Sequence, residues 1–224
     1  MGKVIIQPHT TKNPITLIGE EAGICYGADI TNEIRNYKRG LDCIESNHGR
    51  TLEYPQVYMI FEGYSARVLR EYYTHIGGAP TRLQASTRYI GYSDFDYIIP
   101  PDIEKNPEAK EIYEECMHKI ATARVRLATE CGISKEDSAN LLPLGMESRM
   151  VVRTNLRNLM DMDLVRSCSR AYWEIQNLMR DIKKALSEYS DEWNYLVKNH
   201  FKTKCDITQS CQEKKSCGRY EKKN

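Results

Sequence analysis

The stretch "SRMVVRTNLRNLMDMDLVRSCSRAYWEIQNLMRDIKKALSEY", residues 148–189, decides the fold. Its first seven residues have the β-branched content of a short strand. Asn155 follows in the position of a helix N-cap, so residues 156–189 are predicted to form one long helix. Apolar side chains recur along it at helical spacing, at Leu159, Val165, Ala171, Leu178, Ile182 and Leu186. A strand that leads directly into a long helix predicts an α+β fold.

The remaining strands are predicted to be few and to lie in the first third of the chain. Residues 53–65 are predicted to form a strand whose apolar centre is Val57, Met59 and Phe61. In residues 3–26, apolar and polar residues alternate well enough to predict one or two short strands. Ser65 is in the N-cap position of a following helix, which Gly77 and Gly78 are expected to end.

Apolar spacing and capping residues also predict four other helices, over residues 28–46, 100–132, 134–143 and 191–201. The apolar face of the second of these is expected to comprise Ile112, Cys116, Ile120, Ala123, Leu127 and Cys131. We therefore expect one α+β domain over residues 1–203, with a small, mostly antiparallel sheet and long helices. A polar, cysteine-containing tail is expected over residues 204–224.

Composition and charge exclude several classes of protein. The 224 residues carry a net charge of +1, whereas a duplex nucleic-acid binder is usually far more basic. No apolar run approaches the roughly 20 residues that span a bilayer, and the first residues lack a signal-peptide core. Ile6 stands where a myristoylation signal has Ser or Thr. We expect a cytoplasmic protein that binds neither membranes nor nucleic-acid polymers.

The eight cysteines divide into two groups. Five are scattered in apolar or helical contexts and are expected to be small buried thiols: Cys25, Cys43, Cys116, Cys131 and Cys168. The last three, Cys205, Cys211 and Cys217, are evenly spaced in the polar tail. Two roles fit these three cysteines. They could bind a metal or act in redox chemistry, or they could simply belong to a locally structured or disordered tail. The absence of a Cys-x2-Cys pair, and of a fourth ligand, favours the local role.

Arginine beside small polar residues is the strongest chemical signal, since the chain has no Walker loop, dinucleotide-binding glycine motif, zinc-hydrolase motif or nucleophile elbow. In "GGAPTRLQASTRYIGYSDFDYIIPP", residues 77–101, Arg82 and Arg88 flank Ser86. In an extended chain Ser86 and Arg88 would point to the same side and could hold a phosphate. The alternative is that these arginines are solvated surface charges.

Two more arginines lie on the predicted helix after Asn155. Arg157 is in its first turn, where a cation is unfavourable beside the helix dipole unless an anion is bound there. The alternative is an ordinary pair with Asp161, four residues on. Arg166 is nine residues further along and does not share a face with Arg157.

The motifs, taken in order, resemble those of the flavin-dependent thymidylate synthases. The matching pieces are His48 with Glu53; "SARVLREYYTH"; Ser86-x-Arg88-Tyr89; "IIPP"; "LLPLG"; Asn155-x-Arg157 with Leu159; and Arg166 ahead of "AYWEIQ". They span about residues 22–200. The resemblance implies reductive methylation of dUMP to dTMP by a homotetramer of α+β subunits, with active sites at subunit contacts. It implies FAD as cofactor, NADPH as reductant, methylenetetrahydrofolate as one-carbon donor, and no metal site.

The resemblance also assigns expected roles to residues of this chain. Arg166 would contact the uracil and stabilise negative charge during catalysis. Substrate-binding roles are expected for Glu71, Arg82, Gln84, Ser86 and Arg88. Cofactor-binding roles are expected for His48, Glu53, His75, Gly77, Gly78, Asn155 and Arg157.

The chain departs from the family pattern at its signature. Where the family has an Arg-His-Arg triplet, this chain has Thr74-His75-Ile76, so only the histidine is kept. The spacing from this triplet to Ser86 is two residues longer than in the family. The chain also has Leu83-Gln84 in place of the family's Asn-Glu pair, Glu71 in place of a Gln, and Ala139 in place of a further Arg. Arg82 or Arg70, or the amides of the glycine pair, could replace the lost donors. Two alternatives follow: a sister enzyme that hydroxymethylates a pyrimidine nucleotide, or a catalytically silent nucleotide-binding protein.

Overall fold

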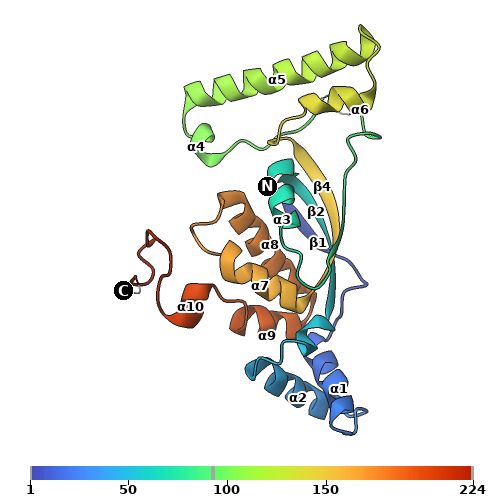
Figure 1. The fold of residues 1–224 in the computed structure, drawn as a ribbon, viewed down its shortest axis with the longest axis vertical. Helices are drawn as coiled ribbons and strands as arrows, with labels where there is room; N and C mark the ends of the chain where they lie inside the picture. Colours follow the sequence, from blue (N-terminus) through green and yellow to red (C-terminus); the bar gives the residue numbers. More distant parts are fainter. Residues whose placement is uncertain (1, 92–93, 223–224) are drawn as a thin grey trace. The chain divides into compact units, whose positions relative to one another are not determined.

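The computed structural model describes residues 2–91 and 94–222. In this part of the chain a four-stranded antiparallel sheet has the order β1-β2-β4-β3. Its strands are β1 (Lys3–Ile6), β2 (Gln56–Ser65), β3 (Thr81–Gln84) and β4 (Glu147–Asn155). Figure 1 shows these short strands among many helices, which confirms the expected α+β class.

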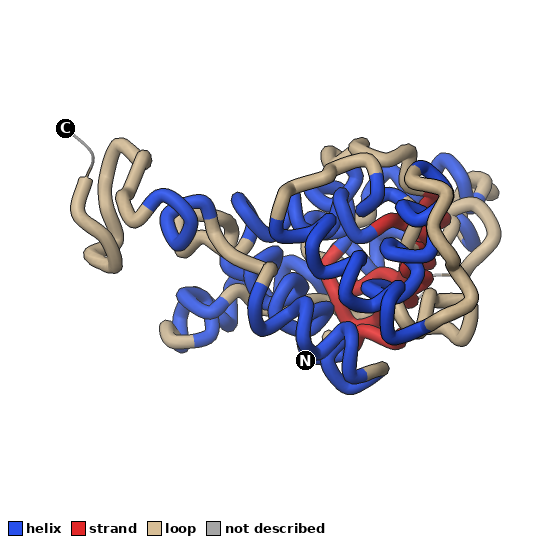
Figure 2. Tube along the Cα trace, turned by 90° about the horizontal axis from the view of Figure 1, so that it is seen from below, coloured by secondary structure: helices blue, strands red, loops and turns tan. Residues whose placement is uncertain are grey.

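The helices make up most of the regular structure, as Figure 2 shows. They are α1 (Pro14–Cys25), α2 (Glu33–Glu45), α3 (Ala66–Tyr73), α4 (Pro101–Glu104), α5 (Pro107–Thr129), α6 (Lys135–Ser138), α7 (Leu156–Arg166), α8 (Trp173–Tyr189), α9 (Asp191–Asn199) and α10 (Lys204–Thr208). Two 3-10 turns are η1 (Thr51–Glu53) and η2 (Ala139–Leu141). None of the described helices is long and apolar enough to cross a membrane.

The described chain divides into two compact units. Unit 1 comprises residues 2–3, 61–71 and 83–150, and unit 2 comprises residues 4–60, 72–82 and 151–222. Each strand of the sheet contributes residues to both units. The division of the sequence into a domain over residues 1–203 and a tail over residues 204–224 stays a prediction.

The two predicted central strands and their caps are confirmed. Val57, Met59 and Phe61 of β2 are completely buried, as alternation along a strand requires. The Ser65 hydroxyl accepts a hydrogen bond from the Val68 amide at 3.1 Å and caps α3. The Asn155 side chain accepts one from the Asn158 amide at 2.9 Å and caps α7. Each strand therefore passes directly into a helix because a polar cap ends it.

The N-terminal prediction of one or two strands is correct only for β1. Residues 14–25 form α1, which begins at Pro14, and its first amides donate to a carboxylate distant in sequence. Glu192 accepts from the Ile15 amide at 2.6 Å and from the Thr16 amide at 3.0 Å. The local sequence offers no side-chain cap, so tertiary contact with α9 stabilises a helix that the local pattern does not indicate.

Both predicted long helices are broken. Asn106 caps α5 with a 3.2 Å hydrogen bond from the Ala109 amide, and this new start separates α4 from α5. Residues 167–172 likewise separate α7 from α8. Leu159, Leu178, Ile182 and Leu186 are completely buried as predicted, but Val165, next to the second break, is 48% exposed.

The expected apolar face of α5 is wrong. Met117 and Arg124 are the residues that this helix buries, whereas Ile112 is 56% exposed. The expectation of five buried thiols is wrong as well. Cys43 is buried, Cys168 is half-buried, and Cys25, Cys116 and Cys131 are exposed. Cysteine packs as a small hydrophobe only where a neighbouring element covers it.

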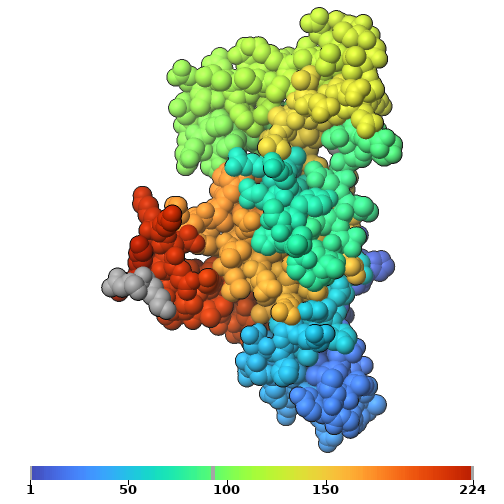
Figure 3. Space-filling view, in the orientation of Figure 1, coloured from blue at the N-terminus to red at the C-terminus, as the bar shows by residue number. Residues whose placement is uncertain are grey.

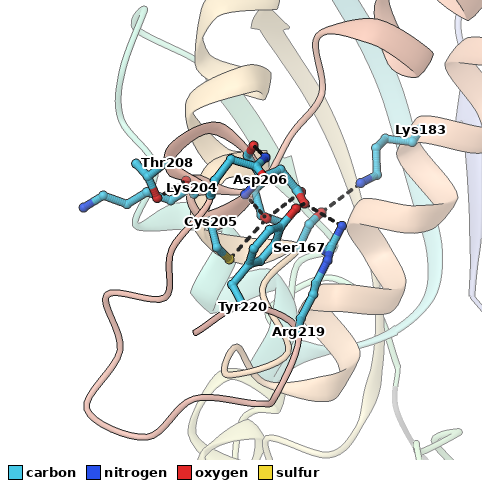
Figure 4. Close-up of polar contacts among 10 residues, drawn as sticks. Ser167, Lys183, Lys204, Cys205, Asp206, Thr208, Arg219 and Tyr220 are labelled. Carbon is cyan, nitrogen blue, oxygen red and sulfur yellow. Dashed lines mark hydrogen bonds and ion pairs between the residues drawn. The ribbon is translucent and has the colours of Figure 1, made fainter. Parts of the chain in front are cut away.

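The described part of the C-terminal tail, residues 204–222, is held by local contacts. Thr203 and Asp206 form a reciprocal capping box at the start of α10. Asp206 also accepts a hydrogen bond from Tyr220 at 3.1 Å and pairs with Arg219 at 2.6 Å, as Figure 4 shows. Cys211 is buried. Within residues 2–91 and 94–222, no three His, Cys, Asp or Glu side chains are grouped to hold a metal.

Candidate functional site

The signature segment, residues 74–79, lies along α7 within unit 2. At its C-terminal side, a Cβ added at Gly78 would overlap the side-chain amide nitrogen of Asn155. A Cβ added at Gly77 would lie 3.1 Å from the side-chain oxygen of Asn158. At the other end of the segment, Thr74 and His75 contact Arg166, the last residue of α7. The segment therefore follows α7 from its N-cap to its end.

Backbone geometry explains the glycine at position 78. Gly78 has φ +68°, a left-handed conformation that glycine adopts without steric cost. Ala79 follows with φ +47°, and its carbonyl accepts a 3.3 Å hydrogen bond from Arg153 of β4. Because the Asn155 amide fills the space where a Cβ would stand, both conformation and contact favour glycine at this position.

His75 and Arg166 form the polar centre of this contact. The Arg166 Nε donates to the His75 Nε2 at 2.8 Å, and an Arg166 terminal nitrogen donates to the Thr74 hydroxyl at 3.3 Å. Burial lowers the pKa of His75 to about 4, and the charges of Arg166 and Arg82 act in the same direction. His75 is therefore neutral at physiological pH, and it carries its proton on Nδ1 because Nε2 accepts from Arg166.

Arg82 is held in the same cluster. Its guanidinium donates to the backbone carbonyls of His75 and, at 3.2 Å, of Tyr73. It also lies over the rings of Tyr72 and Tyr73, 5.6 and 5.3 Å from their centres. Burial lowers the pKa of the guanidinium, and its Nε is buried with no hydrogen-bond partner among the described residues. Arg82 is thus a cation fixed by backbone and aromatic contacts.

Arg157 lines a large cavity in unit 2. This cavity has a volume of about 980 Å³ and is lined by α7, by the end of α2 and the residues that follow it into η1, and by the chain from the end of α9 into α10. Arg157 pairs with Glu53 at 2.8 Å, while Asp161 lines the same cavity. The predicted alternative, an ordinary pair of Arg157 with Asp161, is therefore wrong, because the acidic partner comes from η1.

His48 is exposed in the loop between Asn47 and Gly49, which line this cavity. Its carbonyl accepts hydrogen bonds from the Thr51 amide at 2.9 Å and from the Thr51 hydroxyl at 2.7 Å. The predicted cofactor residues His48, Glu53, His75, Gly77, Gly78, Asn155 and Arg157 therefore all belong to unit 2. Their ligands stay predictions.

The predicted phosphate residues Ser86 and Arg88 belong to unit 1, and their expected extended geometry is wrong. Strand β3 ends at Gln84, and the Arg88 amide donates to the Ser86 hydroxyl at 3.1 Å within a turn. The Arg88 guanidinium pairs with Glu136 at 3.1 Å and is exposed. A serine hydroxyl that captures a nearby amide favours a turn over a strand.

Two other predicted substrate residues, also in unit 1, contact neighbours that the sequence pattern did not indicate. Gln84 donates to the Ser148 hydroxyl of β4 at 3.3 Å. Glu71 approaches Arg67, one turn earlier on α3, at 3.9 Å. These contacts leave the roles of Gln84 and Glu71 as predictions.

Similarity to known proteins decides how these residues are interpreted. The family model described as "Thymidylate synthase complementing protein" matches residues 8–190. The chain belongs to the flavin-dependent thymidylate synthase family. The match includes the signature segment, the end of β4 and α7, which together carry the His75–Arg166 contact and the Asn155 cap.

Relatives named flavin-dependent thymidylate synthase match much of the chain. The protein from Nitratidesulfovibrio vulgaris is 28% identical over 231 residues, which is 94% of this chain and 92% of the relative. The protein from Thermococcus onnurineus is 31% identical over 138 residues, 58% of this chain and 54% of the relative.

A solved structure shows the same fold. Thymidylate synthase X from Helicobacter pylori, crystallised with FAD and dUMP, aligns with a TM-score of 0.69 and 18% identity. The alignment covers 90% of this chain and 100% of that chain. At this identity the likeness establishes the family fold alone.

Several cavity residues carry no motif that predicts them. Asn47 and Arg50 follow α2, whereas His200 and Lys202 follow α9, and all four line the cavity beside Arg157. No motif connects them, because residues separated by about 150 positions meet only after folding. The sole local signal was the position of Asn47, Gly49 and Arg50 around the predicted residue His48.

Proposed function

We propose that this chain is an FAD-dependent thymidylate synthase that methylates dUMP to dTMP, with methylenetetrahydrofolate as carbon donor and NADPH as reductant. The observation that carries the proposal is the contact of residues 74–79 with α7 along its length, ending in the 2.8 Å hydrogen bond between Arg166 and His75. Family membership supports it, because the family match over residues 8–190 includes both of these segments.

The donor set in unit 2 fits an anionic dinucleotide such as FAD. The cavity beside Arg157 combines cationic side chains with apolar ones, including Ile44, Leu52 and Leu164. A mostly apolar pocket with a few placed polar groups is the usual lining of a cofactor site. Asn155, Arg157, His48 and Glu53 would hold the cofactor, with His75, Gly77 and Gly78. When bound, FAD supplies the electron-transfer chemistry of the reaction.

Arg166 is the proposed catalytic residue. Its guanidinium would contact the uracil of dUMP and stabilise negative charge that develops on the ring. His75 keeps this guanidinium in place as an acceptor, which it can do only while neutral. A positioned cation of this kind needs no protein nucleophile, so the absence of a serine or cysteine triad fits the proposal.

Ser86 and Arg88 are proposed to hold the dUMP phosphate, with Gln84 and Glu71 as further substrate contacts. The pair of Arg88 with Glu136 is exposed, so water already weakens it and a phosphate can replace the carboxylate. Arginine binds phosphate through two parallel hydrogen bonds, which makes the exchange favourable.

Arg82 is proposed to replace a cation lost from the family signature. Its guanidinium is fixed beside His75 and has a buried Nε that lacks a partner within the described residues. Arg82→Ala should weaken binding of FAD or of dUMP, measured by titration of each ligand. Unchanged affinity for both would refute the replacement.

We propose that the active form is a homotetramer with active sites at subunit contacts. The support is α5, coloured green in Figure 3, in which the residues other than Met117 and Arg124 are partly or fully exposed. Ile112 on this helix is 56% exposed, and Leu83 and Tyr89, also in unit 1, are 70% and 78% exposed. A contact between subunits at unit 1 would bury large exposed apolar side chains such as these.

The altered signature supports one alternative, hydroxymethylation of a pyrimidine nucleotide, because Thr74 and Ile76 replace two expected arginines. A silent nucleotide-binding protein is the other. The deciding experiment is anaerobic incubation of the purified protein with FAD, NADPH, methylenetetrahydrofolate and dUMP, with products identified by mass. We expect dTMP. A hydroxymethylated product would support the sister enzyme, and no flavin binding would support the silent protein.

A further inference from the structure

The large cavity of unit 2 has a wall that the family model does not include. That match ends at residue 190, yet Asn199, His200, Lys202 and Ile207 line the cavity beside Arg157. These residues run from the end of α9 into α10. Residues 203–206 fix this wall through the capping box of Thr203 and Asp206. The C-terminal segment is therefore an ordered part of the cavity.

The cavity lining carries charges of both signs. Arg50, Arg157 and Lys202 line the cavity together with Glu45 and Asp161. Arg157 is already paired with Glu53. Within the described residues, neither Arg50 nor Lys202 forms an ion pair, although Glu45 and Asp161 line the same cavity, so both cationic groups remain available to an anionic ligand. This arrangement suits an extended anionic ligand such as a diphosphate.

His200 adds an unsatisfied polar atom at the same place. Its Nε2 is buried and has no hydrogen-bond partner among the residues that the structure describes. Burial lowers the pKa of His200, and the charge of Lys202 lowers it while Glu45 raises it. A buried polar atom without a partner costs free energy that a ligand hydrogen bond would recover.

We infer that Lys202 and His200 are binding residues for the anionic dinucleotide cofactor, and that the segment after α9 forms part of the FAD site. This inference rests on the proposed function. Lys202 contributes a cation for the diphosphate, and His200 contributes a hydrogen bond from within the wall. The apolar side chains of Leu164 and Ile207 in the lining would contact the rings of the ligand.

The test is titration of the full-length, flavin-free protein with FAD, followed by flavin fluorescence. Lys202→Ala should weaken FAD binding about tenfold, as expected for loss of one charge-assisted hydrogen bond. Lys202→Arg should retain most of the affinity, because it keeps the charge. The loss should shrink as salt is raised. His200→Ala should weaken binding by a smaller factor.

Lys198→Ala is the matched control, because Lys198 is an exposed lysine on α9 that does not line this cavity. Its affinity for FAD should equal that of the wild type. The inference would be overturned if the wild type binds FAD and both Lys202→Ala and His200→Ala bind it as tightly as Lys198→Ala does. That result would leave the proposed function intact. Failure of the wild type to bind FAD would overturn the proposed function itself.

Discussion

In unit 2 several candidate ligand-binding side chains contact one another, whereas in unit 1 the candidate phosphate residue Arg88 contacts an exposed carboxylate. Arg166 donates to His75, Arg82 holds the backbone of the same histidine, and Gly78 meets Asn155. In unit 1 Arg88 pairs with Glu136, and both side chains are about 60% exposed. The contrast indicates that the cofactor residues are held in place before ligands bind, while the phosphate residues must exchange partners.

The largest expected effect comes from the fixed cluster. Arg166→Ala should lower kcat by about 10²–10³-fold, because it removes a positioned cation from the developing charge. Steady-state kinetics with dUMP measures the loss, and circular dichroism should show an unchanged fold. Arg170→Ala, an exposed arginine after α7, is the control and should retain wild-type turnover. Retained activity in Arg166→Ala would remove this residue from the site.

The exchange proposed for unit 1 can be tested from both sides of its ion pair. Arg88→Ala should weaken dUMP binding by about tenfold or more and leave FAD binding unchanged. Glu136→Gln should strengthen dUMP binding by less than about fivefold, because an exposed pair contributes little. Isothermal titration measures the affinity of both variants for dUMP. Arg126→Ala on α5 is the control. Weaker FAD binding in Arg88→Ala would contradict the separation of roles.

The fixed geometry of the signature segment should also appear in stability. Gly78→Ala should lower the free energy of unfolding by about 1–3 kcal/mol, because alanine is strained at φ +68° and its Cβ would meet Asn155. Gly77→Ala should cost less, since its Cβ would lie 3.1 Å from Asn158. Urea unfolding measures the free energy of unfolding of both variants. Equal stability of Gly78→Ala and wild type would show that the segment is not held against α7.

A pH dependence of stability is expected from His75. Its pKa is about 4 in the folded protein and near 6.5 when unfolded. The stability that this group contributes is therefore present above pH 6.5 and is lost as pH falls towards 4. His75→Gln should flatten the dependence of Tm on pH in that window. His118→Gln, at an exposed position on α5, is the control. An unchanged pH profile in His75→Gln would place His75 in a solvated environment.

The sequence predicted those parts of the fold and site that local signals specify. Val57, Met59 and Phe61 alternate along β2, and the caps at Ser65 and Asn155 lie at strand-to-helix junctions. Non-local contacts were missed. The cap of α1 is Glu192, and the partner of Arg157 is Glu53, 104 residues away. The break after α7 was missed because apolar spacing continued through it.

The sequence predicted which residues belong to the site, but it did not predict which of them contact one another. The resemblance selected His75 and Arg166, but no sequence pattern indicated that one donates to the other across 91 positions. The turn at Ser86 was missed because an extended chain was expected there, and the serine hydroxyl instead accepts from the Arg88 amide. Lys202 and His200 carried no signal, since their relation to Arg157 exists only in the folded chain.

Growth of a thymidine-requiring bacterial strain without thymidine tests the central claim most directly. The wild-type gene should restore growth, and Arg166→Ala, expressed at the same level, should not. Absence of growth with the wild-type protein, present in soluble form and carrying bound flavin, would contradict the assignment of thymidylate synthesis to this chain.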